Sequence, residues 1–322
     1  MSAVRCLSAA EIEAAATVLR GGHVLGLPTE TVYGLAADAT NEQAVARVYA
    51  AKGRPLDHPV IVHLARLEQV ALWAKGIPDY AVALAKAFWP GPMTLVLPKT
   101  EKAGSFVTGG QDTVALRIPN HPVALAVLRE FGDGVCAPSA NRFGSVSPTT
   151  ASEVVAELGQ WLSADDAVID GGRCEVGVES TIIDCTGDRP RILRPGGITA
   201  AQVEEVTRLS LETGESAVRA PGTLASHYSP RAEVWLASEE SQLAELARNF
   251  PGAGFIALDS TVTPDGLQRL ASPLDAQEYA RSLYSALRSA DELGLAAVIA
   301  LPPTGVDIAL AVRDRLVRAA HK

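Results

Sequence analysis

The chain consists of short apolar segments separated by polar turns, and the spacing of the apolar positions changes from segment to segment. Residues 59–64 (PVIVHL), 93–97 (MTLVL) and 113–118 (TVALRI) are almost wholly apolar and rich in β-branched side chains, which is typical of buried strands. Weaker patterns of the same kind predict short strands at residues 23–27, 134–138, 167–170, 181–185 and 191–193.

Helices are indicated by apolar residues three or four positions apart that follow a capping residue. Asn41 precedes such a stretch, which predicts a helix that ends near residues 52–55 (KGRP). Ser8-x-x-Glu11 has the pattern of a capping box at the start of a first helix. Residues 28–35 (PTETVYGL) show neither the helical spacing nor the pattern of a strand, and we expect them to form a loop.

The pattern divides the chain into three parts. Residues 1–208 have many strands in irregular alternation with helices, which predicts an α/β domain with a twisted, mixed, open sheet. Residues 209–231 are polar and rich in Gly and Pro, and we interpret them as a linker that acts as a lid. Strands and helices then alternate regularly over residues 232–322, which predicts a smaller, Rossmann-like C-terminal α/β domain with a parallel sheet.

Composition narrows the class of protein. Of the 322 residues 48% are hydrophobic, which is enough for a packed core, and the net charge of −9 argues against broad adhesion to nucleic acid or to anionic membranes. The four cysteines form no CxxC pair, and no apolar run reaches the length of a membrane span. We therefore expect a reduced, cytoplasmic protein without membrane contact.

Nucleotide-binding and hydrolase signatures are missing from the sequence. There is no GxxxxGK[ST] phosphate loop, no HExxH and no GxSxG. Gly252 and Gly254 superficially fit a dinucleotide fingerprint, but they precede an apolar run instead of following a strand, so we interpret them as a turn.

Polar residues at strand ends are the remaining signal. Lys52 and Arg54 lie in a Gly- and Pro-rich turn, Arg117 ends a predicted strand, and Arg194 precedes Pro-Gly. Taken singly, the first pair fits a solvated turn and Arg117 fits a structural ion pair. Taken together with the hydroxyl and amide groups of residues 139–147 (SANRFGSVS), these cations suit a small polyanion and a carboxylate.

Seven sequence blocks carry a family resemblance: PTETVYGLAADA, KGRPLDHPVIVH, WPGPMTLVL, VALRIPNHP, APSANRFGSVSPT, ESTIID and RPG. In order and spacing they resemble the YrdC/TsaC-type threonylcarbamoyl-AMP synthases over residues 8–205, and the remainder resembles the long, two-domain form of that family. The KxR and SxN signature corresponds to Lys52, Arg54, Ser139 and Asn141. His58 stands where the family usually has Asn.

The resemblance implies a YrdC-like fold and a nucleotidyl transfer. L-Threonine, bicarbonate or CO2, and ATP would give L-threonylcarbamoyladenylate and pyrophosphate, with Mg2+ carried by ATP and no metal site of the protein's own. A downstream transferase complex would move the threonylcarbamoyl group to tRNA, and any direct contact of this chain with tRNA is expected to be weak.

The resemblance also assigns roles to individual residues. Threonine would be held by Thr31, His63, Arg117, Ala137 and Thr181. ATP would be held by Arg54, His58, Thr113, Ser139, Ser147, Arg194 and Tyr228. Lys52, Arg54, Ser139 and Asn141 would be the catalytic group.

Two other functions fit the fold that the resemblance implies. A carbamoyl-adenylating domain of hydrogenase maturation would usually carry zinc-type CxxC pairs, which this chain lacks. A non-catalytic RNA-binding module fits poorly, because acidic residues outnumber basic ones on both sides of residue 208 and aromatic residues make up only 5% of the chain.

Overall fold

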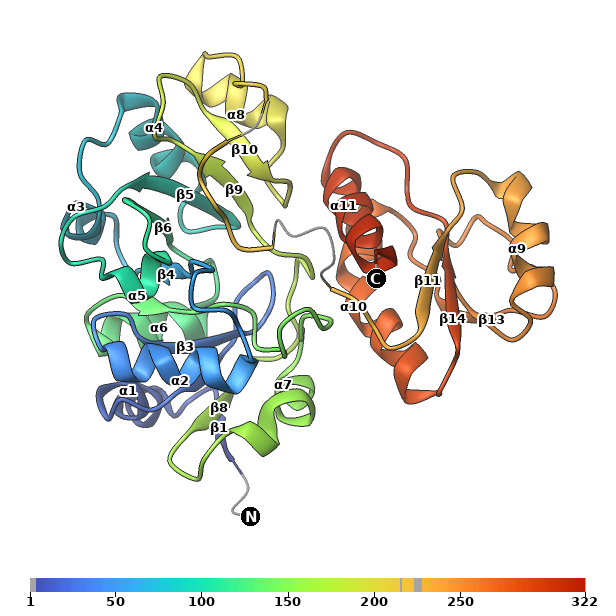
Figure 1. The fold of residues 1–322 in the computed structure, drawn as a ribbon, viewed down its shortest axis with the longest axis horizontal. Coiled ribbons are helices and arrows are strands. Elements are labelled where there is room, and N and C mark those ends of the chain that lie inside the picture. Colours follow the sequence, from blue (N-terminus) through green and yellow to red (C-terminus); the bar gives the residue numbers. More distant parts are fainter. Residues whose placement is uncertain (1–3, 215, 223–227, 322) are drawn as a thin grey trace.

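Two separate sheets organise the chain (Figure 1), which is described from a computed structural model over residues 4–214, 216–222 and 228–321. The first sheet has the strand order β1-β8-β2-β3-β7-β4-β6-β5-β9-β10 among these residues. Its strands are β1 (Arg5–Ser8), β2 (Leu25–Leu27), β3 (Gly34–Asp38), β4 (Ile61–His63), β5 (Met93–Pro98), β6 (Thr113–Arg117), β7 (Val135–Cys136), β8 (Ala167–Asp170), β9 (Thr181–Asp184) and β10 (Arg191–Arg194).

The middle of this sheet brings together residues that are far apart in sequence. β4 and β6 run parallel, and their register pairs His63 with Arg117. β5 and β9 also run parallel, with Met93 opposite Thr181, whereas β7 is antiparallel to both β3 and β4. The mixed sheet predicted from the sequence is therefore confirmed, and it places His63 and Arg117 side by side at one strand end.

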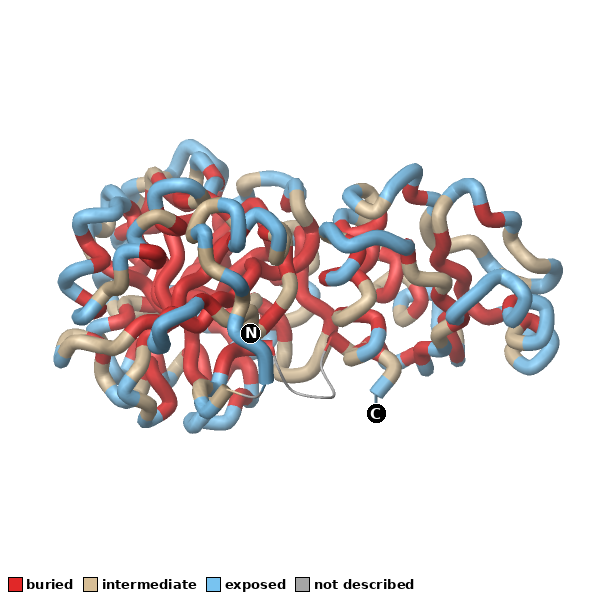
Figure 2. Tube along the Cα trace, turned by 90° about the horizontal axis from the view of Figure 1, so that it is seen from above, coloured by how far each residue is buried: buried red, intermediate tan, exposed pale blue. Residues whose placement is uncertain are grey.

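The helices cover this sheet and enclose the largest core of the molecule, so that buried residues concentrate inside the domain (Figure 2). The side chain of Asn41 accepts hydrogen bonds from the backbone N–H groups of Gln43 and Ala44, which confirms the predicted N-cap. The helical segments are α1 (Ile12–Arg20), α2 (Glu42–Lys52), α3 (Val70–Trp73), α4 (Asp79–Phe88), α5 (Ser105–Thr108), α6 (Pro122–Phe131), α7 (Ala151–Leu158) and α8 (Ala200–Thr207), with 3₁₀ turns at Leu67–Gln69 and Gly159–Trp161.

The second sheet is parallel throughout, in the order β11-β14-β12-β13. It consists of β11 (Glu233–Leu236), β12 (Gly254–Ile256), β13 (Gln268–Ala271) and β14 (Ala297–Ala300), with α9 (Leu243–Asn249), α10 (Ala276–Glu292), α11 (Ile308–Ala320) and a 3₁₀ turn at Glu240–Gln242. α10 and α11 lie between this sheet and the first domain (Figure 1).

The two domains share buried surface. Val32, Val146 and Val178 of the first domain belong to the same buried cluster as Tyr279 and Leu283 of α10. Polar contacts add to this packing, because the side chain of Arg281 donates to the carbonyl of Glu175 at 2.9 Å and that of Arg288 donates to the carbonyl of Val146 at 3.0 Å. The second domain is therefore packed against the first and is not a tethered appendage.

Three strands were missed by the sequence pattern, namely β1, β3 and β13. β3 begins at Gly34, within the stretch expected to be a loop, because its small side chains carry no β-branched signal. The first capping box was placed wrongly. Helix α1 begins at Ile12 with Glu11 as N-cap, whereas Ser8 ends β1 and donates to the Glu11 carboxylate from both its backbone N–H and its hydroxyl group.

The proposed lid falls partly outside the described residues, since residues 215 and 223–227 are not among them. The limits of the three parts at residues 208 and 231 stay predictions. Among the described residues no helix has the length and apolar character needed to cross a membrane.

Gly177 gives a test of how closely the domains are packed. It has φ +81°, and a Cβ atom there would meet Cα of Arg281 at 2.4 Å and the carbonyl oxygen of Ala280 at 2.5 Å. We expect Gly177→Ala to separate α10 from the first domain, shown by faster cleavage of the linker in limited proteolysis and a lower free energy of unfolding.

Gly172→Ala is the matched control. Gly172 has nearly the same backbone angle, φ +86°, but no atom lies within 4 Å of the added Cβ. It should cost only the roughly 1–2 kcal/mol of a left-handed non-glycine residue. Equal losses of stability and equal cleavage in the two variants would show that the contact of Gly177 with α10 is unimportant.

Candidate functional site

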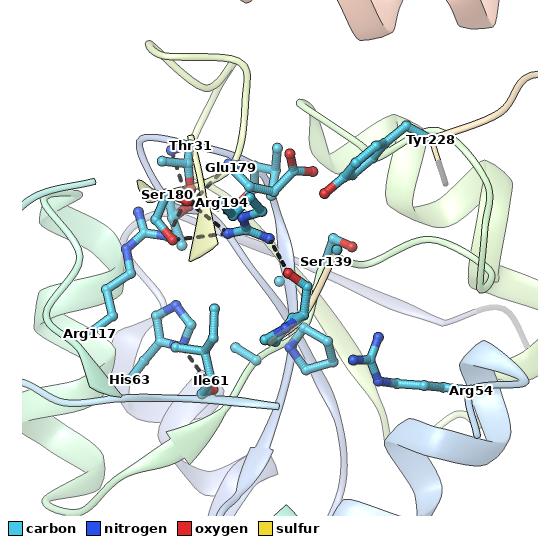
Figure 3. A pocket seen from close by; sticks show the side chains of 17 residues that line it. Thr31, Arg54, Ile61, His63, Arg117, Ser139, Glu179, Ser180, Arg194 and Tyr228 are labelled. Atoms are coloured by element: carbon cyan, nitrogen blue, oxygen red, sulfur yellow. Dashed lines mark hydrogen bonds between the residues drawn. The ribbon is translucent and has the colours of Figure 1, made fainter. Parts of the chain in front are cut away.

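A cleft that is partly open to solvent lies where β4, β6 and β10 meet the loops of the first domain (Figure 3). Predicted site residues that line it are Thr31, Arg54, His63, Arg117, Ala137, Ser139, Arg194 and Tyr228. The structure therefore brings together residues from both halves of the predicted site and from the linker.

Arg117 is held by a buried ion pair at one end of the cleft. Its guanidinium group donates to the Glu30 carboxylate at 2.7 Å, to the Thr31 hydroxyl at 2.9 Å and to the carbonyl of Gly91 at 3.3 Å. A guanidinium group has five N–H donors, so two remain for a ligand among the described contacts. The structural ion pair and the ligand-binding role that the sequence left open are thus compatible.

His63 lies beside Arg117 and is fully buried. Burial, together with the positive charge of Arg117, lowers the pKa of the His63 imidazole to about 3, against a weak opposing hydrogen bond to the carbonyl of Ile61. The ring is therefore neutral at physiological pH and offers hydrogen bonds without adding charge.

Arg194 and Arg54 are the other cations among the described lining residues, with Arg54 on the far side from Arg117 and Arg194 beside Ser180 (Figure 3). Arg194 donates to the carbonyl and hydroxyl of Ser180 at 2.9 and 3.1 Å and to the carbonyl of Pro221 at 3.0 Å. Arg54 donates to the carbonyl of Pro59 at 2.8 Å. Burial lowers the pKa of both guanidinium groups. Because their described partners are neutral groups, these two arginines add positive charge to the cleft.

Lys52 supports the Ser139 loop from within. Its ammonium group donates to the backbone carbonyls of Ser139 and Asn141, and burial, with repulsion from Arg54, lowers the pKa of Lys52 well below its usual value. The amide of Asn141 turns back to donate to the carbonyl of Ser145 at 2.8 Å. The KxR and SxN motifs therefore meet in space, with Lys52 bracing the loop that presents Ser139.

Other predicted residues do not line the cleft, namely Lys52, His58, Thr113, Asn141, Ser147 and Thr181. The hydroxyl of Thr181 donates to the carbonyl of Ile198 at 2.8 Å, and that of Ser147 donates to the Glu179 carboxylate at 2.7 Å. The His58 ring contacts that of Phe143 edge-on, with ring centroids 5.3 Å apart. The structure gives these three residues supporting contacts around the cleft.

Glu179 and Ser180 are among the lining residues that received no role from the sequence. Both belong to the ESTIID block, so their position in a motif was the available signal. Glu179 is the one carboxylate among the described lining residues. Its partners include Tyr284 and Arg315 of the second domain, which the sequence did not indicate at all.

Metal-binding capacity is low in the described part of the chain, where no group of three or more His, Cys, Asp or Glu side chains is placed to hold a metal ion. Both carboxylate oxygens of Glu179 already accept hydrogen bonds from protein groups. The lining thus does not fit a metal site built by the protein itself.

Comparison with known proteins identifies two matching families. Residues 17–196 match the family of Sua5, YciO and YrdC proteins described as "Telomere recombination", and residues 198–321 match the family described as "Threonylcarbamoyl-AMP synthase, C-terminal domain". Together they cover nearly the whole chain.

Individual relatives agree with these families. Threonylcarbamoyl-AMP synthases from Pyrococcus abyssi and Bacillus subtilis are each 39% identical to the chain, over 96% of its length and 94% and 93% of theirs. The solved structure of P. abyssi Sua5 complexed with L-threonine superimposes with a TM-score of 0.87 at 37% identity, covering 98% of this chain and 97% of that one.

The buried His63 ring predicts a specific pH dependence of stability. Its pKa of about 3 in the folded protein lies below the value of roughly 6.5 in the unfolded chain. As the pH falls below 6.5 the unfolded chain therefore takes up a proton that the folded protein does not, and stability is lost. Between pH 7 and pH 5 we expect the free energy of unfolding to fall by about 2 kcal/mol less in His63→Asn than in the parent protein, measured by urea unfolding. Parallel stability curves would show that the native ring is protonated in this range.

Proposed function

Because the chain belongs to the family of threonylcarbamoyl-AMP synthases, we propose that the cleft of Figure 3 is where its substrates meet. The reaction joins L-threonine, bicarbonate or carbon dioxide, and ATP into L-threonylcarbamoyladenylate and pyrophosphate, for threonylcarbamoyladenosine modification of tRNA. The observation that carries the proposed location is the set of three arginines in the cleft lining: Arg117, whose charge Glu30 balances, and Arg54 and Arg194, whose described partners are neutral.

The Arg117 end suits the amino acid. Two guanidinium N–H groups can bind the threonine carboxylate in bidentate form, while the neutral His63 ring and the Thr31 hydroxyl offer hydrogen bonds to its polar groups. The backbone of Ala137 lines the same region. Thr181, whose hydroxyl is engaged with Ile198, would act by shaping the wall of this site.

The remainder of the cleft suits ATP. Arg54 and Arg194 provide charge for the phosphates, Ser139 provides a hydroxyl and Tyr228 provides an aromatic face. His58, Thr113 and Ser147 would complete the nucleotide site from its rim. The neutral carbonyl partners of the two arginines can be exchanged for phosphate oxygens, which form stronger, charge-assisted hydrogen bonds.

The chemical step is favoured by positioning and by electrostatics. A carbamate oxygen of N-carboxythreonine forms a bond to the α-phosphorus of ATP, the bond from that phosphorus to the bridging oxygen breaks, and pyrophosphate leaves with the electron pair. Both reactants are anions, so fixed cations and donors lower the barrier more than a strong base would. Lys52 contributes by bracing the Ser139 loop, and Asn141 contributes by fixing its turn.

Mg2+ would enter with ATP, bound to its phosphates, because the described residues include no group of His, Cys, Asp or Glu side chains placed to hold it. The product is a mixed anhydride, which is reactive toward water, so a transferase has to take over its threonylcarbamoyl group. We propose that this partner acts in the cytoplasm and that tRNA binds mainly to the partner, since the chain is acidic.

The first test of this function is substrate dependence. We expect pyrophosphate release to require L-threonine, bicarbonate and ATP together, and to stop when any one of them is omitted. ATP hydrolysis that does not depend on threonine would contradict the assignment.

Arg117 provides the second test, and its ion pair dictates the design. Removing Arg117 alone would leave the buried Glu30 carboxylate unpaired, which costs about 3–5 kcal/mol of stability. We therefore expect the double variant Glu30→Gln with Arg117→Met to stay folded but to lose roughly 2–5 kcal/mol of threonine binding, measured by titration calorimetry.

Glu30→Gln alone is the matched control, because it keeps the guanidinium group. It should bind threonine more tightly than the double variant does. Equal loss of threonine and ATP binding in the double variant would mean that Arg117 does not bind the amino acid.

A further inference from the structure

Arg315 of α11, in the second domain, contacts Glu179, one of the residues that line the cleft. Its guanidinium group is completely buried and donates to the Glu179 carboxylate at 2.8 Å and to the carbonyl of Pro195 at 3.0 Å. Tyr284 of α10 donates to the same carboxylate oxygen at 2.8 Å. The only carboxylate among the described lining residues is thus held from behind by two side chains of another domain.

Glu179 is ionised in this setting. Although burial raises the pKa of its carboxyl group, the charges of Arg315 and Arg194 and the hydrogen bonds from Arg315 and Ser147 lower it to about 2. An ionised carboxylate beside a triphosphate site would repel ATP. It would also attract Arg194, a cation of the cleft lining whose charge already acts on Glu179 and whose described hydrogen-bond partners are neutral.

Arg315 also holds the linker. Its guanidinium carbon lies 5.1 Å from the centre of the Tyr228 ring, and that ring stacks on Tyr284 at 5.7 Å. Tyr228 has φ +62°, a conformation that costs a non-glycine residue free energy and persists only when its surroundings enforce it. One buried guanidinium group therefore contacts the first domain, the linker and the second domain.

We propose that Arg315 is a positioning residue of the nucleotide site: it neutralises Glu179 from the second domain, which leaves Arg194 available to the phosphates of ATP and keeps Tyr228 in the cleft wall. The second domain thus contributes to the nucleotide half of the site and to a much smaller degree to the threonine half. This inference rests on the proposed location of ATP binding.

Charge rescue is the measurement that separates positioning from mere packing. We expect Arg315→Met to raise the KM for ATP roughly tenfold, the effect of one uncompensated charge near the phosphates, and to change the KM for threonine less than about twofold. Adding Glu179→Gln removes the uncompensated charge at nearly constant shape. The double variant should recover ATP affinity to within about threefold of the parent protein.

Arg313→Met is the matched control on the same helix, because Arg313 donates only to the carbonyls of Pro303 and Gly305 within the second domain among its described contacts. The KM values of Arg313→Met for ATP and for threonine should equal those of the parent protein. An unchanged KM for ATP in Arg315→Met would overturn the proposal, as would a raised KM that Glu179→Gln does not lower in folded protein.

A second variant and a check of the parent protein complete the experiment. If Arg315→Met does not fold, Tyr284→Phe is tested in its place, since it removes one hydrogen bond from Glu179 and leaves the ring stack in place. This variant should raise the KM for ATP about threefold with little effect on the KM for threonine. KM values for both substrates equal to those of the parent protein would overturn the proposal. A parent protein that releases no pyrophosphate with all three substrates would instead refute the proposed function.

Discussion

Buried charge is the constraint on which the site depends. Lys52, Arg54, Arg117, Arg194 and Arg315 are all buried, and two buried carboxylates, Glu30 and Glu179, lie among them in the described structure. Each carboxylate has one arginine as its direct partner, and backbone carbonyls satisfy the other cations. Around the cleft, buried cations therefore outnumber buried carboxylates, which the negative net charge of the chain does not suggest.

That arrangement costs stability, since desolvating a cation is unfavourable unless hydrogen bonds compensate. Neutral carbonyls offset this desolvation cost only partly. The lowered pKa values of Lys52, Arg54 and Arg194 reflect the part that is not offset. A polyanion entering the cleft would supply the missing charge. Burying these cations costs free energy during folding, and binding of the polyanion would recover part of it. A site built in this way is preorganised for the negative charge of its substrate.

Local signals in the sequence predicted the fold class and the parallel second sheet, and the family resemblance predicted eight of the seventeen described residues that line the cleft. The cap Asn41 and β-branched runs such as residues 59–64 can be recognised from neighbouring residues of a single helix or strand. β3 was missed because Gly34 and its small neighbours are buried by the surrounding sheet and not by any preference of their own. Arg117 was correctly expected to need an anion, but its partner Glu30 could not be identified, since pairing across 87 positions depends on sheet register.

Arg315 shows the same limit across domains. It lies on the buried face of α11 together with Val312, Leu316 and Ala319, and an arginine on an apolar helical face requires an anion. The sequence alone does not reveal that this anion is 136 positions away. Because the direct counter-charge of Glu179 comes from the second domain, the nucleotide site that we propose would be complete only when both domains are packed together.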